Sequence, residues 1–369
     1  MRIGDALQNH HDVEYFFGST REFIGGSGWD RVSLPLRAFR DWRIASRLRR
    51  YQQLGKFDLW QIHNVMPGLS PSVYQTALDL GIPTIHFLHN YRFGCVNGMF
   101  LNHGQPCQRC LKGNFWPAFL TACWHDSHLI SGWQSLILLN LRRRKLFHRI
   151  NRWIALSEAQ KDLHLKMGFP GEQVSVVPHF YEPKAPPPPA APMGPVLFLG
   201  RLSPEKGCPD LLQAWAHASL GPRELWIGGT GPEEERLRRL ASAQSSVRFL
   251  GFLNPVEQSE TWSKSSFAVI PSIVPETFGM IVLEAWARQR PVIAYRIGAL
   301  AETIEDGVDG LLVTPGDVEG LARAIQRLAS DPSLNQRLGQ AGHAKLRQRY
   351  SHNVWLGRME KIYASLLPA

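Results

Sequence analysis

Four charged residues in the second half of the chain have the types and spacing to bind a phosphorylated, hydroxyl-rich ligand. Arg201 and Lys206 share the turn RLSPEKG, where a guanidinium and an ammonium group could neutralise a diphosphate without a metal ion. Glu276 and Glu284 flank a short apolar segment in PETFGMIVLEAWA, residues 275–287. Because carboxylates repel phosphate, we expect these two to accept hydrogen bonds from neutral hydroxyl groups.

The backbone between the two glutamates supports the same interpretation. Phe278, Gly279 and Met280 begin a predicted helix, so their amide groups lack partners within the helix and point toward an approaching anion. Gly200 and Gly229 lie in turns at the ends of two predicted strands and are further candidates for contact with a nucleotide. A single glycine-containing turn is weak evidence, but together these positions predict a site for a nucleotide diphosphate.

The candidate residues follow predicted strands that alternate with helices. In the second half we predict strands over 196–200, 223–229, 247–251, 267–272 and 290–295. In the first half we predict strands over 57–64, 83–90 and 152–157, and a helix over 70–81. Repeated alternation of this kind predicts an α/β fold with parallel sheets, which bind ligands at the carboxyl ends of their strands.

A chain of 369 residues is too long for one ordinary core, so two domains are expected. We predict an amino-terminal acceptor-binding domain over 1–182 and a donor-binding domain over 196–350. The proline-rich segment 183–195 is predicted to be an extended connector, because proline neither continues a helix nor joins a central strand. Residues 351–369 are predicted to form a helix that returns toward the first domain.

Positive charge is concentrated in the first half of the chain. The formal net charge is +10, and most of the excess lies in residues 1–180, notably in the clusters 37–50 and 141–149. Both clusters suit either solvated helix faces or contact with an anionic membrane surface or acceptor. No nucleic-acid-binding motif accompanies the charge, so nucleic acid is not an expected partner. Without a recognisable signal peptide or spanning segment, we expect a cytoplasmic protein, peripheral on the inner membrane face.

Four cysteines lie close together in the first half of the chain: Cys95, Cys107, Cys110 and Cys123. Without a secretory signal a disulfide framework is not expected. A Cys-x2-Cys pair with two outlying thiols has the composition of a tetrahedral zinc site. A structural zinc ion and independent reduced thiols are both compatible with this pattern.

Several motifs together resemble glycosyltransferase family 4, a retaining family with the GT-B fold. In the second half they are LGRLSPEKG, GGTGPEEERL, PETFGMIVLEAWARQRPVIA and EDGVDGLLVTPGD. In the first half they are FDLWQIHNVMPGLSPSV, PTIHFLHNYRFGCVNGMF and ALSEAQKDLHLKMGFPGEQVSVVPHF. They occur in the expected order and cover about residues 55–350. The resemblance implies two Rossmann-like parallel-sheet domains that face a central cleft.

The resemblance also implies a role for each candidate residue. Arg201 and Lys206 would hold the diphosphate of the donor and stabilise the departing nucleotide. Glu276 would contact hydroxyls of the transferred sugar and Glu284 those of the ribose, while the amides at the start of the following helix would bind phosphate or sugar. His89, at the end of TIHFLHN, would face the transferred sugar. By its position alone, His89 could equally be a hydrogen-bonded residue at a strand end.

The implied reaction moves a sugar from a nucleotide-diphosphate sugar to a hydroxyl of a glycan or lipid-linked acceptor, with retention of configuration. Its setting would be the assembly of a surface polysaccharide or glycolipid. The chain contains no Asp-x-Asp motif, so a metal-independent transferase is expected. The alternative is a catalytically inactive GT-B protein that binds a nucleotide sugar or a partner. An epimerase or a phosphorylase would share the architecture. A phosphorylase would need a lysine context for pyridoxal phosphate, which we do not find.

The chain departs from the family pattern at three places. Gln289 stands where the family usually has glycine, and His179 where it usually has asparagine. Met1 enters near the end of the family's first helix, so we expect the first strand and its glycine-rich loop to be missing. ALQNHHDVEYFF then corresponds to the last turn of that helix and the second strand, and the glycine-rich segment 24–28 follows the wrong strand to replace the loop. A truncated first domain would favour the inactive alternative.

Overall fold

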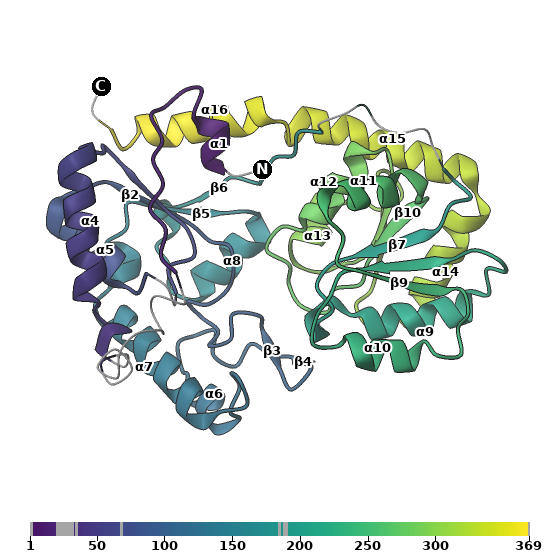
Figure 1. Cartoon of the computed structure of the whole chain (residues 1–369), viewed down its shortest axis with the longest axis horizontal. Coiled ribbons are helices and arrows are strands. Elements are labelled where there is room, and N and C mark those ends of the chain that lie inside the picture. Colours follow the sequence, from purple (N-terminus) through teal and green to yellow (C-terminus); the bar gives the residue numbers. More distant parts are fainter. Residues whose placement is uncertain are drawn as a thin grey trace.

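The computed structural model describes residues 3–19, 33, 36–66, 69–183, 186 and 191–367. Two parallel β-sheets form the centres of two lobes (Figure 1). This arrangement confirms the predicted α/β architecture with two parallel-sheet units. The glycine-rich segment 24–28 and part of the predicted connector 183–195 lie outside the described residues.

The sheet of the first lobe has four parallel strands in the order β1-β2-β5-β6. They are β1 (Trp60–Ile62), β2 (Thr84–Phe87), β5 (Arg152–Ala155) and β6 (Val174–Val176). The first three fall within predicted strands, whereas β6 was not predicted. Because Ile62 pairs with His86 in the parallel register, the residues that follow β1 and β2 emerge together at one edge of the sheet.

Helices and a small hairpin surround this sheet. They are α1 (Ile3–Leu7), α4 (Trp42–Gly55), α5 (Ser72–Leu80), α6 (Trp116–Leu120), α7 (His128–Arg143), α8 (Glu158–Lys166), the 3₁₀ turns η1 (Leu146–His148) and η2 (Gly171–Gln173), and the strands β3 (Leu101–Asn102) and β4 (Gln105–Pro106). Helix α5 agrees with the prediction over 70–81 and ends at Gly81, whose left-handed φ of 67° suits glycine. Helix α4 occupies most of the first basic cluster, but Arg37 of that cluster is buried against Asp41 rather than solvated.

The start of the described chain differs from the sequence prediction in one respect. Helix α1 stands where we expected the last turn of a helix. The rest of ALQNHHDVEYFF, where we expected the second strand, contains no strand in the structure. The backbone carbonyl of Tyr15 instead accepts a hydrogen bond from the hydroxyl of Tyr51 at 3.3 Å, and Phe16 packs edge-on against the same tyrosine ring. Aromatic packing onto α4 therefore takes the place of strand pairing.

The sheet of the second lobe has six parallel strands in the order β12-β11-β10-β7-β8-β9. They are β7 (Val196–Leu199), β8 (Leu225–Gly228), β9 (Val247–Gly251), β10 (Phe267–Ile270), β11 (Val292–Tyr295) and β12 (Leu311–Val313). All but β12 fall within predicted strands. Alternate residues of β7 and β10 enter hydrophobic clusters on opposite faces, so this sheet is buried on both sides.

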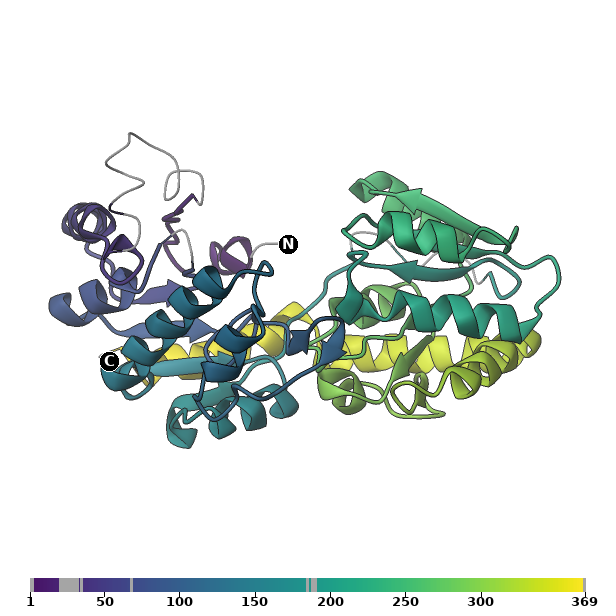
Figure 2. The ribbon, with the colours of Figure 1, turned by 90° about the horizontal axis from the view of Figure 1, so that it is seen from below.

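The helices of the second half cover these two faces and then cross to the first lobe. They are η3 (Pro204–Lys206), α9 (Cys208–Ala218), α10 (Glu234–Leu240), α11 (Pro255–Lys264), α12 (Met280–Ala287), α13 (Gly298–Thr303), α14 (Val318–Ser330), α15 (Pro332–Arg349) and α16 (His352–Ala364). In both ribbon views α15 runs beside the second lobe and α16 beside the first (Figures 1 and 2). His11 contacts Glu360 at 2.8 Å, and the hydroxyl of Tyr363 donates to Gln61 Oε1 at 2.8 Å. The domain boundaries themselves stay a prediction.

The departure from the family pattern at Gln289 has a conformational consequence. Gln289 follows the end of α12 with a φ of 54°, in the left-handed region that favours glycine. We expect Gln289→Gly to raise the free energy of unfolding by about 0.5–1 kcal/mol, because glycine adopts this φ without the steric penalty of a Cβ. Thermal or denaturant unfolding measures the change.

A matched control is Ser365→Gly, at the end of α16. Ser365 has an ordinary φ of −78°, so glycine there removes no strain and should not stabilise the chain. Equal effects at the two positions, or a loss of stability in Gln289→Gly, would contradict the assignment of strain to Gln289.

Candidate active site

A cavity of about 350 Å³ lies between the two lobes, at the carboxyl ends of their strands. The first lobe contributes residues that follow β2, β5 and β6, and the second lobe contributes the ends of β7 and β10, η3 and the start of α12. The lining residues are His89, Leu156, His179, Phe198, Leu199, Lys206, Val269, Ile270, Ser272, Glu276, Thr277, Phe278, Gly279, Met280 and Ile281. Six of the predicted site residues therefore share one cavity: His89, Lys206, Glu276, Phe278, Gly279 and Met280.

Lys206 and Glu276 form an ion pair in this cavity, with Nζ and Oε1 2.6 Å apart. Both side chains are largely buried, with exposed fractions of 29% and 17%. The hydroxyl of Ser272 donates a second hydrogen bond to the same carboxylate oxygen at 2.7 Å. Glu276 is thus held by two partners from the second lobe, and Lys206 keeps further ammonium protons for a ligand.

Close approach of two backbone segments brings Lys206 to Glu276. The turn after β7 ends at Gly207, which has a φ of 65°, and a Cβ there would overlap the carbonyl oxygen of Pro271. The amide of Ile273 also donates to the carbonyl of Glu205 at 3.0 Å. Because β7 and β10 are neighbours in the sheet, these contacts join the turns that follow them.

The start of α12 presents its backbone to the cavity, as the sequence predicts. Gly279 precedes the helix with a φ of 88°, a conformation that other residues rarely adopt. Phe278, Gly279 and Met280 all line the cavity. Helix amides in this position favour a negatively charged group, since they lack partners within the helix.

The first lobe holds the loop that carries Glu276. The hydroxyl of Ser157, after β5, donates to the carbonyl of Thr277 at 3.1 Å. The hydroxyl of Tyr91, after β2, donates to the carbonyl of Glu276 at 3.5 Å. These two hydrogen bonds join the first lobe directly to the loop between β10 and α12.

Four predicted site residues are not among the described residues that line the cavity. Arg201 is exposed on the turn after β7. Gly200 and Gly229 lie at neighbouring strand ends that approach so closely that a Cβ on Gly229 would overlap the carbonyl oxygen of Gly200. Glu284 lies farther along α12 and accepts a hydrogen bond from Gln258 Nε2 at 2.9 Å. Burial raises the pKa of Glu284, and the charge of Arg288 opposes that rise.

Three histidines stack along the first-lobe side of the cavity. The ring of His89 lies 5.0 Å from that of His63 and 5.7 Å from that of His179, with interplanar angles of 23° and 12°. Burial, followed by the neighbouring rings, lowers the pKa of His63 to about 3 and that of His179 to about 4. Burial also lowers the pKa of His89. All three rings are therefore neutral near pH 7.

Comparison with known families agrees with this geometry. The family described as Glycosyltransferase Family 4 matches residues 1–184, and the family described as Glycosyl transferases group 1 matches residues 193–345. The chain belongs to glycosyltransferase family 4. The crystal structure of Anabaena HepE in complex with UDP is 20% identical and has a TM-score of 0.66, covering 87% of this chain and 82% of that chain. The family-4 protein thus has the GT-B fold.

Curated relatives of the family-4 protein match over part of their length. An exopolysaccharide phosphotransferase of Streptomyces coelicolor is 36% identical over 172 residues, which are 45% of this chain and 18% of that protein. The lipopolysaccharide core biosynthesis glycosyltransferase LpsE of Rhizobium meliloti is 33% identical over 173 residues, which are 46% of this chain and 49% of that protein. The matches therefore span about half or less of these relatives.

Sequence reasoning did not select three residues at the site of the family-4 protein: Ser272 and His179, which line the cavity, and His63, which contacts His89. Ser272 and His179 were visible only as the end of a predicted strand and as a departure from the family pattern, and His63 only as part of the segment after β1. Each of these residues is placed by a partner that sequence reasoning did select: Glu276, in the same loop, for Ser272, and His89 for both histidines. A polar residue directly after a buried parallel strand was the available signal.

The possible zinc site at the four cysteines of the family-4 protein stays a prediction. The four cysteines do line one small cavity. Among the described residues, however, which include all of these cysteines, no group of three or more Cys, His, Asp or Glu side chains is arranged to hold a metal ion.

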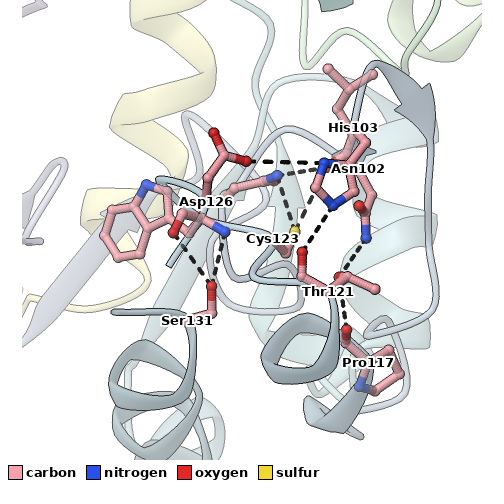
Figure 3. Close-up of polar contacts among 10 residues, drawn as sticks. Asn102, His103, Pro117, Thr121, Cys123, Asp126 and Ser131 are labelled. Carbon is pink, nitrogen blue, oxygen red and sulfur yellow. Dashed lines mark hydrogen bonds and ion pairs between the residues drawn. The ribbon is translucent and has the colours of Figure 1, made fainter. Parts of the chain in front are cut away.

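Three of the four cysteine sulfurs make hydrogen bonds with neighbouring side chains. The Cys95 thiol donates to Asn97 Oδ1 at 3.0 Å, Asn97 Nδ2 donates to Cys123 Sγ at 3.3 Å, and Arg109 Nε donates to Cys107 Sγ at 3.4 Å. Figure 3 shows Cys123 within the surrounding network of loop contacts. Burial raises the pKa of Cys110 to about 11 and that of Cys123 to about 12, so both thiols are neutral near pH 7 in the absence of a metal ion.

Proposed function

We propose that this family-4 protein transfers a sugar from a nucleotide-diphosphate sugar to a hydroxyl of a glycan or lipid-linked acceptor, with retention of configuration. The observation that carries the proposal is the Lys206–Glu276 pair at 2.6 Å, inside an interlobe cavity that the start of α12 also lines. Cation, carboxylate and helix amides together match a ligand that has both a diphosphate and sugar hydroxyls.

Each group would act on a different part of the donor. Lys206 would neutralise charge that develops on the departing diphosphate, and the exposed guanidinium of Arg201 would fold over the same phosphates. Glu276, oriented by Ser272, would accept from hydroxyls of the transferred sugar. Glu284 would accept from the ribose, which requires exchange of its present bond to Gln258. The acceptor hydroxyl would attack on the face that the nucleotide leaves, and the leaving phosphate would take its proton.

The test is a nucleotide-release screen of the full chain with UDP-, GDP- and ADP-sugars and oligosaccharide or lipid-linked acceptors. UDP-sugars come first because HepE, which has the same fold, was solved with UDP. Acceptor-dependent release supports the transferase, and the anomeric protons of the product report retention by NMR. Saturable donor binding without release under any condition would instead support the inactive alternative.

The assembly of a surface polysaccharide or glycolipid is the setting we propose for this reaction. The support comes from the relatives, which are named for exopolysaccharide and lipopolysaccharide core synthesis. A large or lipid-linked acceptor would fit a first lobe that presents an exposed, basic surface. We therefore also propose that the first lobe binds an anionic membrane surface.

Helices α6 and α7 carry the features that favour this membrane contact. Their exposed apolar side chains are Trp116, Leu120, Leu129 and Ile130, with exposed fractions from 43% to 84%. Helix α7 ends in Arg142 and Arg143, and the exposed Arg144 and Lys145 follow. Apolar and basic residues of this kind bind the interface of anionic bilayers. Among the described residues, no helix is both long and apolar enough to span a membrane.

We expect the full chain to sediment with vesicles that contain phosphatidylglycerol, and less with pure phosphatidylcholine or at high salt. The double variant Trp116→Ser with Leu129→Ser should bind these vesicles several-fold less, because each substitution removes exposed apolar area. Phe252→Ser is the matched control, since Phe252 is 77% exposed on the second lobe. Equal loss in both variants would contradict a first-lobe membrane surface.

A further inference from the structure

A chain of hydrogen bonds runs from the last helix to the cavity. The hydroxyl of Tyr363, on α16, donates to Gln61 Oε1 at 2.8 Å. Gln61 Nε2 lies 3.0 Å from His63 Nε2, and His63 Nδ1 lies 2.7 Å from His89 Nε2. This series of hydrogen bonds therefore runs from α16 to Gln61 in β1, then to His63, and ends at His89, which lines the cavity.

The chemistry of the four groups gives this chain a direction. Gln61 Oε1 accepts from the phenol, so the amide nitrogen is the Gln61 atom that faces His63, and it can only donate. His63 Nε2 must then accept, which places the single proton of this neutral ring on Nδ1. That proton is donated to His89 Nε2. His89 Nε2 is thereby an acceptor, and the remaining proton of His89 lies on Nδ1.

We propose that Gln61 and His63 are positioning residues that hold His89 as a neutral ring with its proton on Nδ1, so that His89 donates a hydrogen bond in the cavity. This inference rests on the proposed function, in which His89 faces the transferred sugar. It adds that His89 acts through Nδ1–H on a sugar oxygen. It also excludes His89 Nε2 from service as a general base, because that atom is occupied by His63.

The packing around His89 maintains this arrangement. The ring lies in a stack between His63 and His179, and Phe278 packs edge-on against His179 with ring centroids 5.6 Å apart. Stacking fixes the plane of the ring, and the bond to His63 fixes its rotation within that plane. A protonated His63 would present a donor to the donor group of Gln61, and burial of His63 opposes that protonated state.

Packing also holds Tyr363, the first donor of this series of hydrogen bonds, in place. Tyr363 is 7% exposed and packs edge-on against His11, with ring centroids 5.3 Å apart. Burial raises its pKa, so the phenol stays protonated and keeps its role as donor. The segment 352–364, which continues from the second lobe, thus contributes to the proton position of a first-lobe residue at the cavity.

The experiment compares two substitutions of His63, one that keeps the hydrogen-bond donor to His89 and one that removes it. Asparagine carries an amide nitrogen at about the place of His Nδ1, so His63→Asn keeps the bond to His89, whereas His63→Leu removes it. We expect His63→Leu to lower kcat for acceptor-dependent nucleotide release about tenfold with the donor KM unchanged, as for the loss of one hydrogen bond in the transition state. His63→Asn should retain kcat within about threefold, and Tyr363→Phe should lower it about two- to threefold.

The position of the proton is read directly by NMR of the full chain labelled with ¹⁵N-histidine. Signals of His89 are those that disappear in His89→Ala. We expect a protonated Nδ1 and an unprotonated Nε2 in the wild type and in His63→Asn, and an averaged pattern in His63→Leu. A proton on Nε2 in the wild type, or an unchanged pattern in His63→Leu, overturns the proposal. So does equal loss of kcat in the leucine and asparagine variants.

Failure of the proposed function gives a different result. The wild-type protein could release no nucleotide with any donor and still carry the His89 proton on Nδ1 in a way that depends on His63. That result would reject the transferase and support Gln61 and His63 as positioning residues. Normal turnover with the His89 proton on Nε2 would reject the positioning role of Gln61 and His63 and support the transferase.

Discussion

Lys206→Ala is expected to lower kcat about 10³-fold while the protein stays folded. The ammonium group lies in the cavity, paired with Glu276, and it would stabilise charge that forms on the departing diphosphate. Removal of one well-placed electrostatic group of this kind costs about 10²–10³ in rate. Glu276 keeps its hydrogen bond from Ser272, so the variant should not leave a bare buried carboxylate. Nucleotide release and thermal unfolding, measured on the same preparation, test both halves of the prediction.

Lys264→Ala is the control, since Lys264 is an exposed lysine at the end of α11 in the same lobe. It removes the same charge from the protein as a whole but none from the cavity, so it should leave kcat unchanged. Arg201→Ala is expected to lower kcat as well, because Arg201 would share the diphosphate. Near-normal turnover in Lys206→Ala would remove Lys206 from the reaction and, with it, the main support for the proposed donor site.

Gly207→Ala is expected to lower the free energy of unfolding by about 2–5 kcal/mol. Two costs add: a left-handed φ of 65° that alanine rarely adopts, and overlap of the new Cβ with the carbonyl oxygen of Pro271. The turn after β7 can relieve the overlap only by moving away from β10. That movement separates Lys206 from Glu276, so transfer should fall together with stability.

Gly221→Ala separates the two costs. Gly221 has a similar φ of 62°, and a Cβ there would meet nothing within 4 Å. Its expected loss is about 1–2 kcal/mol from backbone strain alone, with transfer unaffected. If denaturant unfolding gives the same loss in both variants, the close approach of Gly207 to Pro271 does not hold the two turns together.

Much of the candidate site was predictable because parallel strands bring the residues that follow them to one edge. His89 lies at the end of a predicted strand, Lys206 and Glu276 follow predicted strands, and the structure places all three in one cavity. The start of α12 was predictable for a similar reason, since Gly279 marks a local backbone requirement that a sequence displays directly. Motifs of this kind depend on a few neighbouring residues.

Other features could not be predicted because they depend on segments far apart in the chain. Glu284 belongs to the same sequence motif as Glu276. It nevertheless accepts a hydrogen bond from Gln258 of α11 and is not among the residues that line the cavity. The spacing of the four cysteines could not show that Asn97 bonds the sulfurs of both Cys95 and Cys123, or that Arg109 bonds the sulfur of Cys107. The strand expected within ALQNHHDVEYFF is absent from the structure, and contacts of Tyr15 and Phe16 with α4 take its place.

The family, the two parallel-sheet units and most strand positions could be predicted from the amino-acid pattern, because hydrophobic periodicity and turn residues are local properties. Which polar groups meet depends on the tertiary structure. The pairing of Lys206 with Glu276 depends on neighbouring strands, and the bond from Tyr363 to Gln61 depends on a helix that returns from the other lobe. Hydrogen bonds and ion pairs act over a few ångströms, so their partners are set by how distant segments pack together.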